Sequence, residues 1–326
     1  AFFVVLLALS QVSCESGSES VYLEGSTMGT QYHVTLVEPP SELDQEELQQ
    51  QIDVMLESLN QSMSTYREES EITRISAAPS GEWLSISEDF LQVLDEALRV
   101  SSNTAGAYDV TVGPLVDLWG FGPQRSDVVP PEGQVASRRQ RVGYQALEVD
   151  RENMRLRKNE PRELDFSSLA KGYGVDRLAA LLEQRKVTNY LVEIGGEIRV
   201  AGHSPRKTDW ALAIERPQLL GGEPVAALAL NAGAVATSGD YRNYFEVDGI
   251  RYSHTIDPRT GYPVEHQLVS VTVIADTAMR ADAWATALTV LGTESAMRVA
   301  QEQSLAVFLI SRKDEALEFH KTTAFD

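Results

Sequence analysis

The second half of the chain consists of short strand-like segments with few helical ones between them, and this pattern restricts the fold strongly. Residues 191–200 form two short strand-like segments around Gly195 and Gly196, and residues 244–252 (YFEVDGIRY) predict a hairpin with Asp-Gly at its turn. Residues 268–274 are apolar enough for a central strand. Hairpins interrupted by a few helices predict an α+β protein with mixed, largely antiparallel sheets and packed helices, not a doubly wound sheet.

The rest of the chain fits one composite domain with two lobes. A strand is expected at residues 31–37 (QYHVTLV), after the turn-prone segment GSTMGT, and a loop at residues 123–134, which are rich in Pro, Gly and polar residues. The expected helices cover residues 46–62, 88–101, 168–184 and 277–291. We find no internal repeat and no long low-complexity linker.

The chain begins with an apolar run, AFFVVLLAL, that suits the core of a signal peptide and is too short for a membrane-spanning helix. The lone cysteine, Cys14, follows it, so we expect a signal-peptide remnant at 1–13, a lipid-anchored polar tether at 14–22 and the folded domain at 23–326. An ordinary cleaved signal or an uncleaved anchor is the alternative. The net charge of -20 opposes binding to nucleic acid, which needs clustered Lys and Arg.

Five segments hold more Gly, Asp and hydroxyl residues than packing requires, and four of them are described first. Residues 164–176 (LDFSSLAKGYGVD) predict a strand end at Asp165 and a helix capped by Ser167 or Ser168, with Lys171 nearby, which is an arrangement that can bind an anion. For residues 193–197 (EIGGE), paired glycines could let the backbone approach a ligand, but a tight turn is the better explanation. Residues 237–241 (TSGDY) fit a turn and a functional strand-end loop equally well. In residues 254–263 (HTIDPRTGYP), His254 beside Asp257 and Arg259 suits a general base or a phosphate contact, although a structural histidine in a turn is the simpler interpretation.

The fifth segment is residues 276–289 (DTAMRADAWATALT), which place Asp282 and Thr286 on one face of a helix. A carboxylate and a hydroxyl there suit Mg²⁺, which takes one or two protein oxygens and completes its shell with phosphates and water. Mn²⁺ accepts the same oxygens. Taken alone, this pattern is better explained by an Asp on the solvated face of an alanine-rich helix.

Together and in this order, the segments resemble the ApbE family of FAD:protein FMN transferases. The upstream segments GSTMGT, MSTYR with SEI, and AYDVTVGPL agree, so the resemblance runs from about Glu24 to the end of the chain. It implies a T-fold-like, two-lobed single domain. By motif, it implies that Asp282, Thr286 and a backbone oxygen near Ser168 hold Mg²⁺. The flavin-dinucleotide contacts that it implies are Met28, Tyr66, Ala107, Tyr108, Asp109, Asp165, Lys171, Ile256 and Ala285.

The reaction that the resemblance implies is attack by a Thr or Ser hydroxyl of a target protein on the FMN-side phosphorus of FAD, with release of AMP. His254 or Asp282 accepts the proton, and His254 is preferred because a metal-bound carboxylate is the weaker base. Implied targets are exported flavoprotein subunits, such as those of sodium-translocating NADH:quinone reductase or the Rnf complex. The implied location is the periplasmic side of a bacterial membrane, with the inner membrane favoured. A metal-dependent FAD pyrophosphatase and a non-enzymatic FAD-binding lipoprotein remain alternatives.

Overall fold

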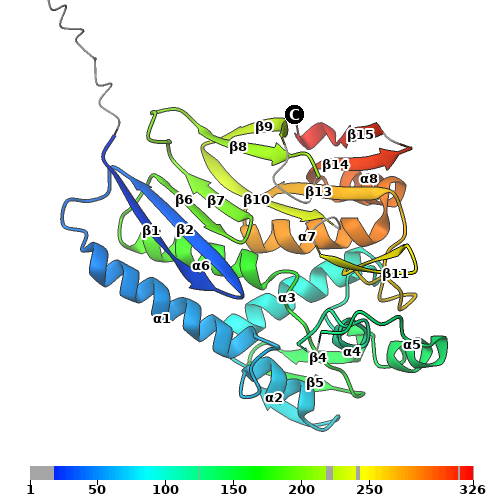
Figure 1. Cartoon of the computed structure of the whole chain (residues 1–326). Helices are drawn as coiled ribbons and strands as arrows, with labels where there is room; N and C mark the ends of the chain where they lie inside the picture. Colours follow the sequence, from blue (N-terminus) through cyan, green and yellow to red (C-terminus); the bar gives the residue numbers. More distant parts are fainter. Residues whose placement is uncertain (1–17, 124, 218–222, 240–242, 315, 326) are drawn as a thin grey trace, which may run out of the picture.

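The computed structural model describes residues 18–123, 125–217, 223–239, 243–314 and 316–325, and it is built around one large sheet (Figure 1). Neighbouring strands of this sheet all run antiparallel. Their order is β1 (Ser20–Thr27), β2 (Thr30–Val37), β6 (Tyr190–Ile194), β7 (Glu197–Ala201), β10 (Ala232–Gly239), β13 (Leu268–Ala275), β14 (Ala306–Lys313) and β15 (Ala316–Lys321). The predicted α+β class with largely antiparallel strands is confirmed.

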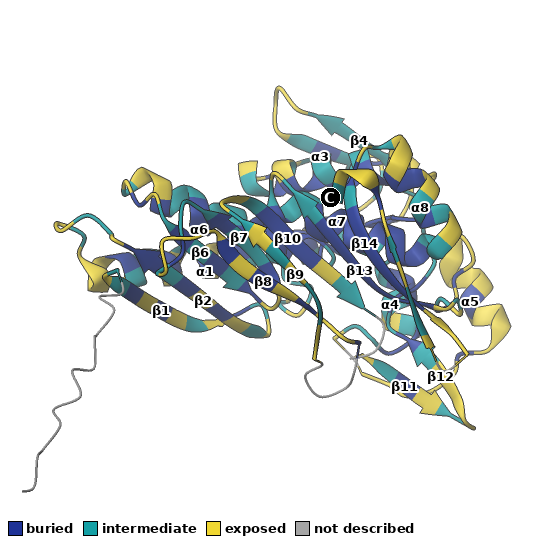
Figure 2. Cartoon of the chain, turned by 90° about the horizontal axis from the view of Figure 1, so that it is seen from above, coloured by how far each residue is buried: buried dark blue, intermediate teal, exposed yellow. Residues whose placement is uncertain are grey.

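Helices cover one face of the large sheet, as Figures 1 and 2 show together. They are α1 (Gln45–Met63), α6 (Ala170–Gln184), α7 (Ala278–Leu291) and α8 (Thr293–Glu302), and α3 (Glu88–Asn103) packs against α1 and α7. Asp44, Ser87 and Thr277 cap α1, α3 and α7, each accepting hydrogen bonds from backbone N–H groups of the first turn. The main hydrophobic core lies between these helices and the sheet. None of the described helices is both long and apolar enough to cross a bilayer.

The start of α6 differs from the prediction. The helix begins at Ala170 with Leu169 in the capping position and no side-chain cap, so the expected cap by Ser167 or Ser168 is wrong. Asp165 lies in no strand and instead accepts a hydrogen bond from the Ser167 N–H at 2.7 Å. The carboxylate therefore shapes the loop before the helix. Near the start of the chain, β1 already includes Ser20, so part of the expected tether at 14–22 belongs to the sheet.

The remaining, smaller elements lie around the large sheet and its helices and do not form a single layer (Figure 1). They are α2 (Glu71–Ala77), β3 (Trp83–Ser85), α4 (Gly113–Leu118), α5 (Glu132–Arg139), η1 (Tyr144–Ala146), β4 (Leu147–Asp150), β5 (Arg155–Lys158), β8 (Trp210–Glu215), β9 (Pro224–Leu230), β11 (Tyr244–Val247), β12 (Ile250–Ser253) and η2 (Thr323–Phe325). Helix α5 begins inside the segment expected to be a loop, so that loop is shorter than predicted. The predicted Asp-Gly hairpin is β11–β12. A separate hydrophobic cluster, which we call the hairpin cluster, contains Leu115, Trp119, Val135, Phe245 and Ile256.

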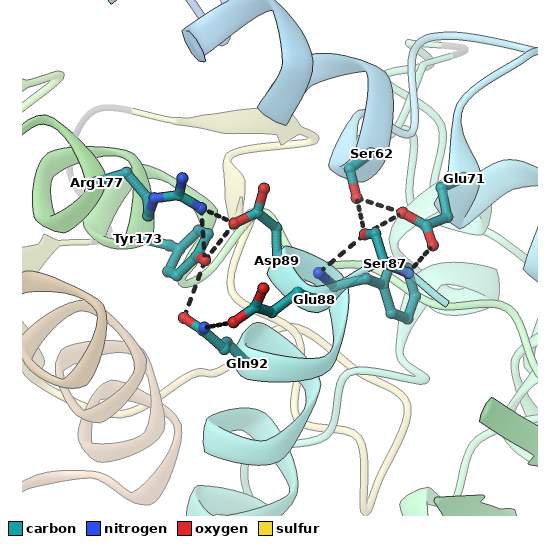
Figure 3. Close-up of polar contacts among 9 residues, drawn as sticks. Ser62, Glu71, Ser87, Glu88, Asp89, Gln92, Tyr173 and Arg177 are labelled. Carbon is teal, nitrogen blue, oxygen red and sulfur yellow. Dashed lines mark hydrogen bonds and ion pairs between the residues drawn. The ribbon is translucent and has the colours of Figure 1, made fainter. Parts of the chain in front are cut away.

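Two carboxylates, the buried Glu71 and the half-buried Asp89, join neighbouring helices (Figure 3). Glu71 accepts hydrogen bonds from the Ser62 hydroxyl and from both the hydroxyl and the N–H of Ser87, each at 2.6 Å. This ties α1, α2 and the start of α3 together. Asp89 accepts from the Tyr173 hydroxyl at 2.6 Å and also from Arg177, so it connects α3 to α6. The tyrosine of the AKGYG motif is therefore structural.

Candidate active site

One cavity of about 680 Å³ brings most of the predicted site residues together. Its volume lies within the roughly 300 to 1,000 Å³ typical of small-molecule and cofactor sites. The predicted residues that line it are Tyr66, Ala107, Tyr108, Asp109, Asp165, Ser168, Lys171, His254, Ile256, Asp282 and Thr286. Met28 and Ala285 do not line it. Met28 lies in the β1–β2 turn with its side chain near Gly174, and Ala285 is buried on α7.

The crossing of α6 and α7 fixes the centre of this cavity. Gly172 lies at the crossing, where an added Cβ would come within 2.6 Å of the Ala278 carbonyl carbon. Its N–H donates to Asp282 Oδ2 at 3.1 Å. Asp176, one turn further along α6, accepts hydrogen bonds from the N–H groups of Ala278 and Met279, each at 2.9 Å. These two N–H groups lie at the start of α7, where a helix has no internal acceptors for them. Gly172 and Asp176 of the KGYGVD motif thus set the distance between α6 and α7.

Asp282 and Thr286 have the surroundings that a cation site between protein and phosphate requires. Asp282 is buried, and burial raises the pKa of its carboxyl, so the charged form needs a cation nearby. Among the described residues its only hydrogen-bond partner is the Gly172 N–H, and the Thr286 hydroxyl has none. Ser168 donates its hydroxyl to Tyr108 Oη at 2.9 Å, which leaves its backbone oxygen as the group able to face a metal.

No group of three or more His, Cys, Asp and Glu in the described part of the chain could hold a metal ion by itself. The oxygens of Asp282 and Thr286 would supply only part of an octahedral shell. Mg²⁺ commonly binds in this way, with one or two protein oxygens and the rest from phosphate and water. The residues present therefore fit a cation that arrives with a phosphate-bearing ligand.

Lys171 is the cation of the site and is held by a residue whose importance was not predicted. Its Nζ forms an ion pair with Glu197 Oε1 at 2.6 Å. Glu197 begins β7, directly after Gly195 and Gly196, and is only 4% exposed. Burial and the charge of Asp282 raise the pKa of its carboxyl, whereas the ammonium of Lys171 opposes this and stabilises the charged carboxylate in the ion pair. The sequence placed Glu197 in a simple turn motif, and only the pairing of β6 with β7 brings it to Lys171.

Other predicted residues build the cavity wall. Asp109 accepts hydrogen bonds from the Thr111 N–H and hydroxyl and from the Tyr144 N–H, so its carboxylate holds the loop that carries Ala107 and Tyr108. Tyr66 lines the cavity but is 70% exposed, which places it at the opening. Thr237 and Ser238, at the end of β10, also line the cavity. The remaining Asp240 and Tyr241 of TSGDY lie outside the described residues, as does Cys14.

His254 is oriented by a backbone carbonyl and not by Asp257. Its Nδ1 lies 2.9 Å from the Asn243 carbonyl oxygen. Because a carbonyl only accepts, Nδ1 carries the proton and Nε2 of the neutral ring keeps a free lone pair. Burial lowers the pKa of His254, which favours this neutral form. Asp257 instead pairs with Arg259 in the following turn, with the closest distance 2.8 Å.

Comparison with known proteins assigns the chain to a family. A model of the ApbE family matches residues 28–309. The chain belongs to the ApbE family. It is 44% identical over 314 residues to the FAD:protein FMN transferase of Vibrio cholerae serotype O1, covering 96% of this chain and 93% of that protein. It is also 44% identical over 328 residues to the FAD:protein FMN transferase of Haemophilus influenzae, with 98% and 95% covered.

The solved structure of "Flavin Transferase ApbE from Vibrio cholerae" has the same fold. It matches with a TM-score of 0.88 and 42% identity, covering 94% of this chain and 98% of that one. The predicted family is therefore confirmed, and so is the prediction of an enzyme, a transferase of a phosphorus-containing group.

Proposed function

We propose that this ApbE-family protein is a Mg²⁺-dependent transferase that moves FMN from FAD to a Thr or Ser hydroxyl of a target protein and releases AMP. The observation that carries the proposal is the convergence of two groups on one cavity. Asp282 and Thr286 provide oxygens for a cation with phosphate ligands, and His254 provides a neutral imidazole nitrogen. The names of the similar proteins support FAD as the donor.

In the proposed reaction, the acceptor oxygen forms a bond to the FMN-side phosphorus of FAD. The bond from that phosphorus to the oxygen that bridges it to the AMP-side phosphorus breaks. AMP leaves with this oxygen, and FMN remains on the protein as a phosphoester. The hydroxyl proton passes to His254 Nε2. This nitrogen has a free lone pair because the proton of the neutral ring is on Nδ1, which donates to the Asn243 carbonyl oxygen. We assign the role of base to His254 and not to Asp282, since Asp282 is needed as a charged oxygen ligand.

The remaining residues position the pyrophosphate and balance its charge. A Mg²⁺ ion held by Asp282, Thr286 and the Ser168 backbone oxygen would neutralise charge on the phosphates. Lys171, at the start of α6, lies in the same cavity and adds a positive charge on a fixed helix turn. Positioning and charge stabilisation supply most of the catalysis in phosphoryl transfer, so this set fits the demands of the reaction.

The location and targets are part of the proposal. The apolar run before Cys14 and the polar tether after it support a lipid anchor on the periplasmic side of a membrane, with the inner membrane favoured. The first described strand, β1, begins only a few residues after Cys14. A protein held so near a bilayer suits acceptors that are themselves exported membrane-associated flavoproteins, such as subunits of sodium-translocating NADH:quinone reductase or Rnf complexes.

The test is to incubate the protein with FAD, Mg²⁺ and a threonine-bearing acceptor domain, with and without EDTA. We expect flavin fluorescence on the acceptor band, one AMP released per flavin attached, and loss of both with EDTA. An acceptor with Thr→Val at the modified position is the control. AMP and FMN released without labelling of the acceptor would indicate a pyrophosphatase instead. Binding of FAD without either product would indicate an FAD-binding protein.

A further inference from the structure

Lys171 lies between two carboxylates of the cavity but pairs with only one of them. Its Nζ is 2.6 Å from Glu197 Oε1, whereas no ion pair to Asp282 exists within 4.0 Å. Asp282 is nevertheless close, because the residue next to Lys171, Gly172, donates its N–H to Asp282 at 3.1 Å. A flexible lysine side chain anchored there has a second available partner, and the choice between the two partners decides whether Asp282 is neutralised from within the protein.

The β6–β7 hairpin holds Lys171 in the observed arrangement. A Cβ added to Gly195, at the turn, would lie 3.3 Å from Lys171 Cδ, so the hairpin backbone runs along the stem of the lysine. Glu193 locks this turn by accepting from the Gly196 N–H at 2.5 Å and contacting His33 at 2.6 Å. Glu193 is thus already engaged, and Glu197 is the carboxylate of this hairpin that reaches Lys171.

Glu197 has no other use within the described residues. Its Oε2 is buried without a hydrogen-bond partner, so the side chain is not there to complete a polar network of the sheet. Burying a carboxylate in this way is costly unless it is paired with a cation. Among the described residues, the ion pair with Lys171 is the contact that offsets this cost. The role of Glu197 is therefore to position the lysine.

From this geometry we propose that Glu197 is a positioning residue that keeps the Lys171 ammonium away from Asp282, so that Asp282 stays available to a divalent cation. The inference rests on the proposed function. Without the Glu197 charge, Lys171 turns to the nearest remaining carboxylate, which is Asp282. The cation then has to displace the lysine, and its apparent affinity falls.

The experiment is a Mg²⁺ titration of the full chain with bound FAD and no acceptor, followed by flavin fluorescence. We expect Glu197→Gln to raise the Mg²⁺ midpoint roughly 10- to 100-fold, the effect typical of residues that support a metal ligand. Lys171→Met removes the competing ammonium. The double variant Glu197→Gln/Lys171→Met should therefore have a midpoint within about twofold of Lys171→Met alone. Glu318→Gln, which breaks an exposed ion pair with Lys313, is the matched control and should not change the midpoint.

Glu197→Asp, which keeps the charge, guards against a folding defect and should shift the midpoint less than Glu197→Gln. The inference is overturned if Glu197→Gln titrates like the wild type, or if its effect persists in full when Lys171 is Met. A wild-type protein that ignores Mg²⁺ or fails to modify the acceptor would remove the proposed function itself. That outcome is visible before any variant is compared.

Discussion

Gly172→Ala tests whether the crossing of α6 and α7 controls the site. The new Cβ would lie 2.6 Å from the Ala278 carbonyl carbon and 2.7 Å from Met279 Cα. Ordinary contact begins at 3.4 Å, so the first of these distances is 3.4 - 2.6 = 0.8 Å too short. Both neighbouring atoms belong to the backbone of α7, which cannot rotate away as a side chain could. The two helices must therefore separate.

Three effects set the size of the change. Overpacking of this kind costs about 1 to 3 kcal/mol. Loss of the hydrogen bond from the Gly172 N–H to the buried Asp282 carboxylate costs about 1.5 to 3 kcal/mol more, since the acceptor is charged. The higher helix propensity of alanine returns about 1 kcal/mol. We expect a net destabilisation of about 1.5 to 5 kcal/mol.

Urea unfolding followed by circular dichroism measures this change, and the transfer assay measures its effect on the site. A shift of Asp282 by about 1 Å should also lower transfer by about 100-fold. Gly133→Ala is the control, because a Cβ there meets nothing within 4 Å and α5 should be unaffected or slightly stabilised. Wild-type stability in Gly172→Ala would refute the view that close helix contact at this glycine is required.

Three further predictions concern single side chains. His254→Gln should lower transfer about 10²- to 10⁴-fold with FAD affinity retained. Because burial lowers the pKa of His254, the wild-type rate should hold its plateau below pH 6.5, near the ordinary pKa of His, and fall only as the pH drops through the lowered value. Thr286→Val should weaken Mg²⁺ binding roughly tenfold or more, measured by FAD fluorescence. Glu71→Gln should destabilise the fold by about 2 to 3 kcal/mol in urea, with unchanged activity per folded molecule, because the Ser87 N–H and the two serine hydroxyls lose a charged acceptor.

Each of these has an opposite outcome that would count against the reasoning. An acid limb at or above pH 6.5 would mean that another group is titrating. A Thr286→Val variant with the wild-type Mg²⁺ response would remove the hydroxyl from the cation site. Reduced activity of fully folded Glu71→Gln would show that the network in Figure 3 does more than join helices.

The accuracy of prediction depended on whether a feature is local in the sequence. Helices α1, α3 and α7 were predicted to within a few residues because apolar spacing is a local signal, and the caps that the structure shows at Asp44, Ser87 and Thr277 are equally local. The start of α6 was wrong because Asp165 uses its carboxylate to form a turn and Ser168 points to Tyr108, 60 residues away in the chain. Serine at a helix start does not reveal such a distant partner.

The site itself followed the same rule. Asp282 and Thr286 were identified because they are one helical turn apart, and the order of the motifs then implied their shared role. Glu197 was missed because its partner, Lys171, is brought to it only by the register of the sheet against α6. The orientation of His254 depends on Asn243 across a hairpin, while the nearby Asp257 was the more obvious partner in the sequence.

The proposed cation ligand and the proposed base lie on parts of the protein with different hydrophobic cores. Asp282 lies on a helix of the main core, whereas His254 follows β12 beside the hairpin cluster of Trp119 and Phe245. Regions with small cores open locally before the whole protein unfolds. Mild denaturant should therefore abolish proton transfer before it abolishes nucleotide binding, which is weakened by the loss of Ile256, and hydrogen exchange at 244–253 should become fast before exchange in α7. The helix that carries Asp282 and the hairpin that leads to His254 are therefore expected to unfold at different denaturant concentrations.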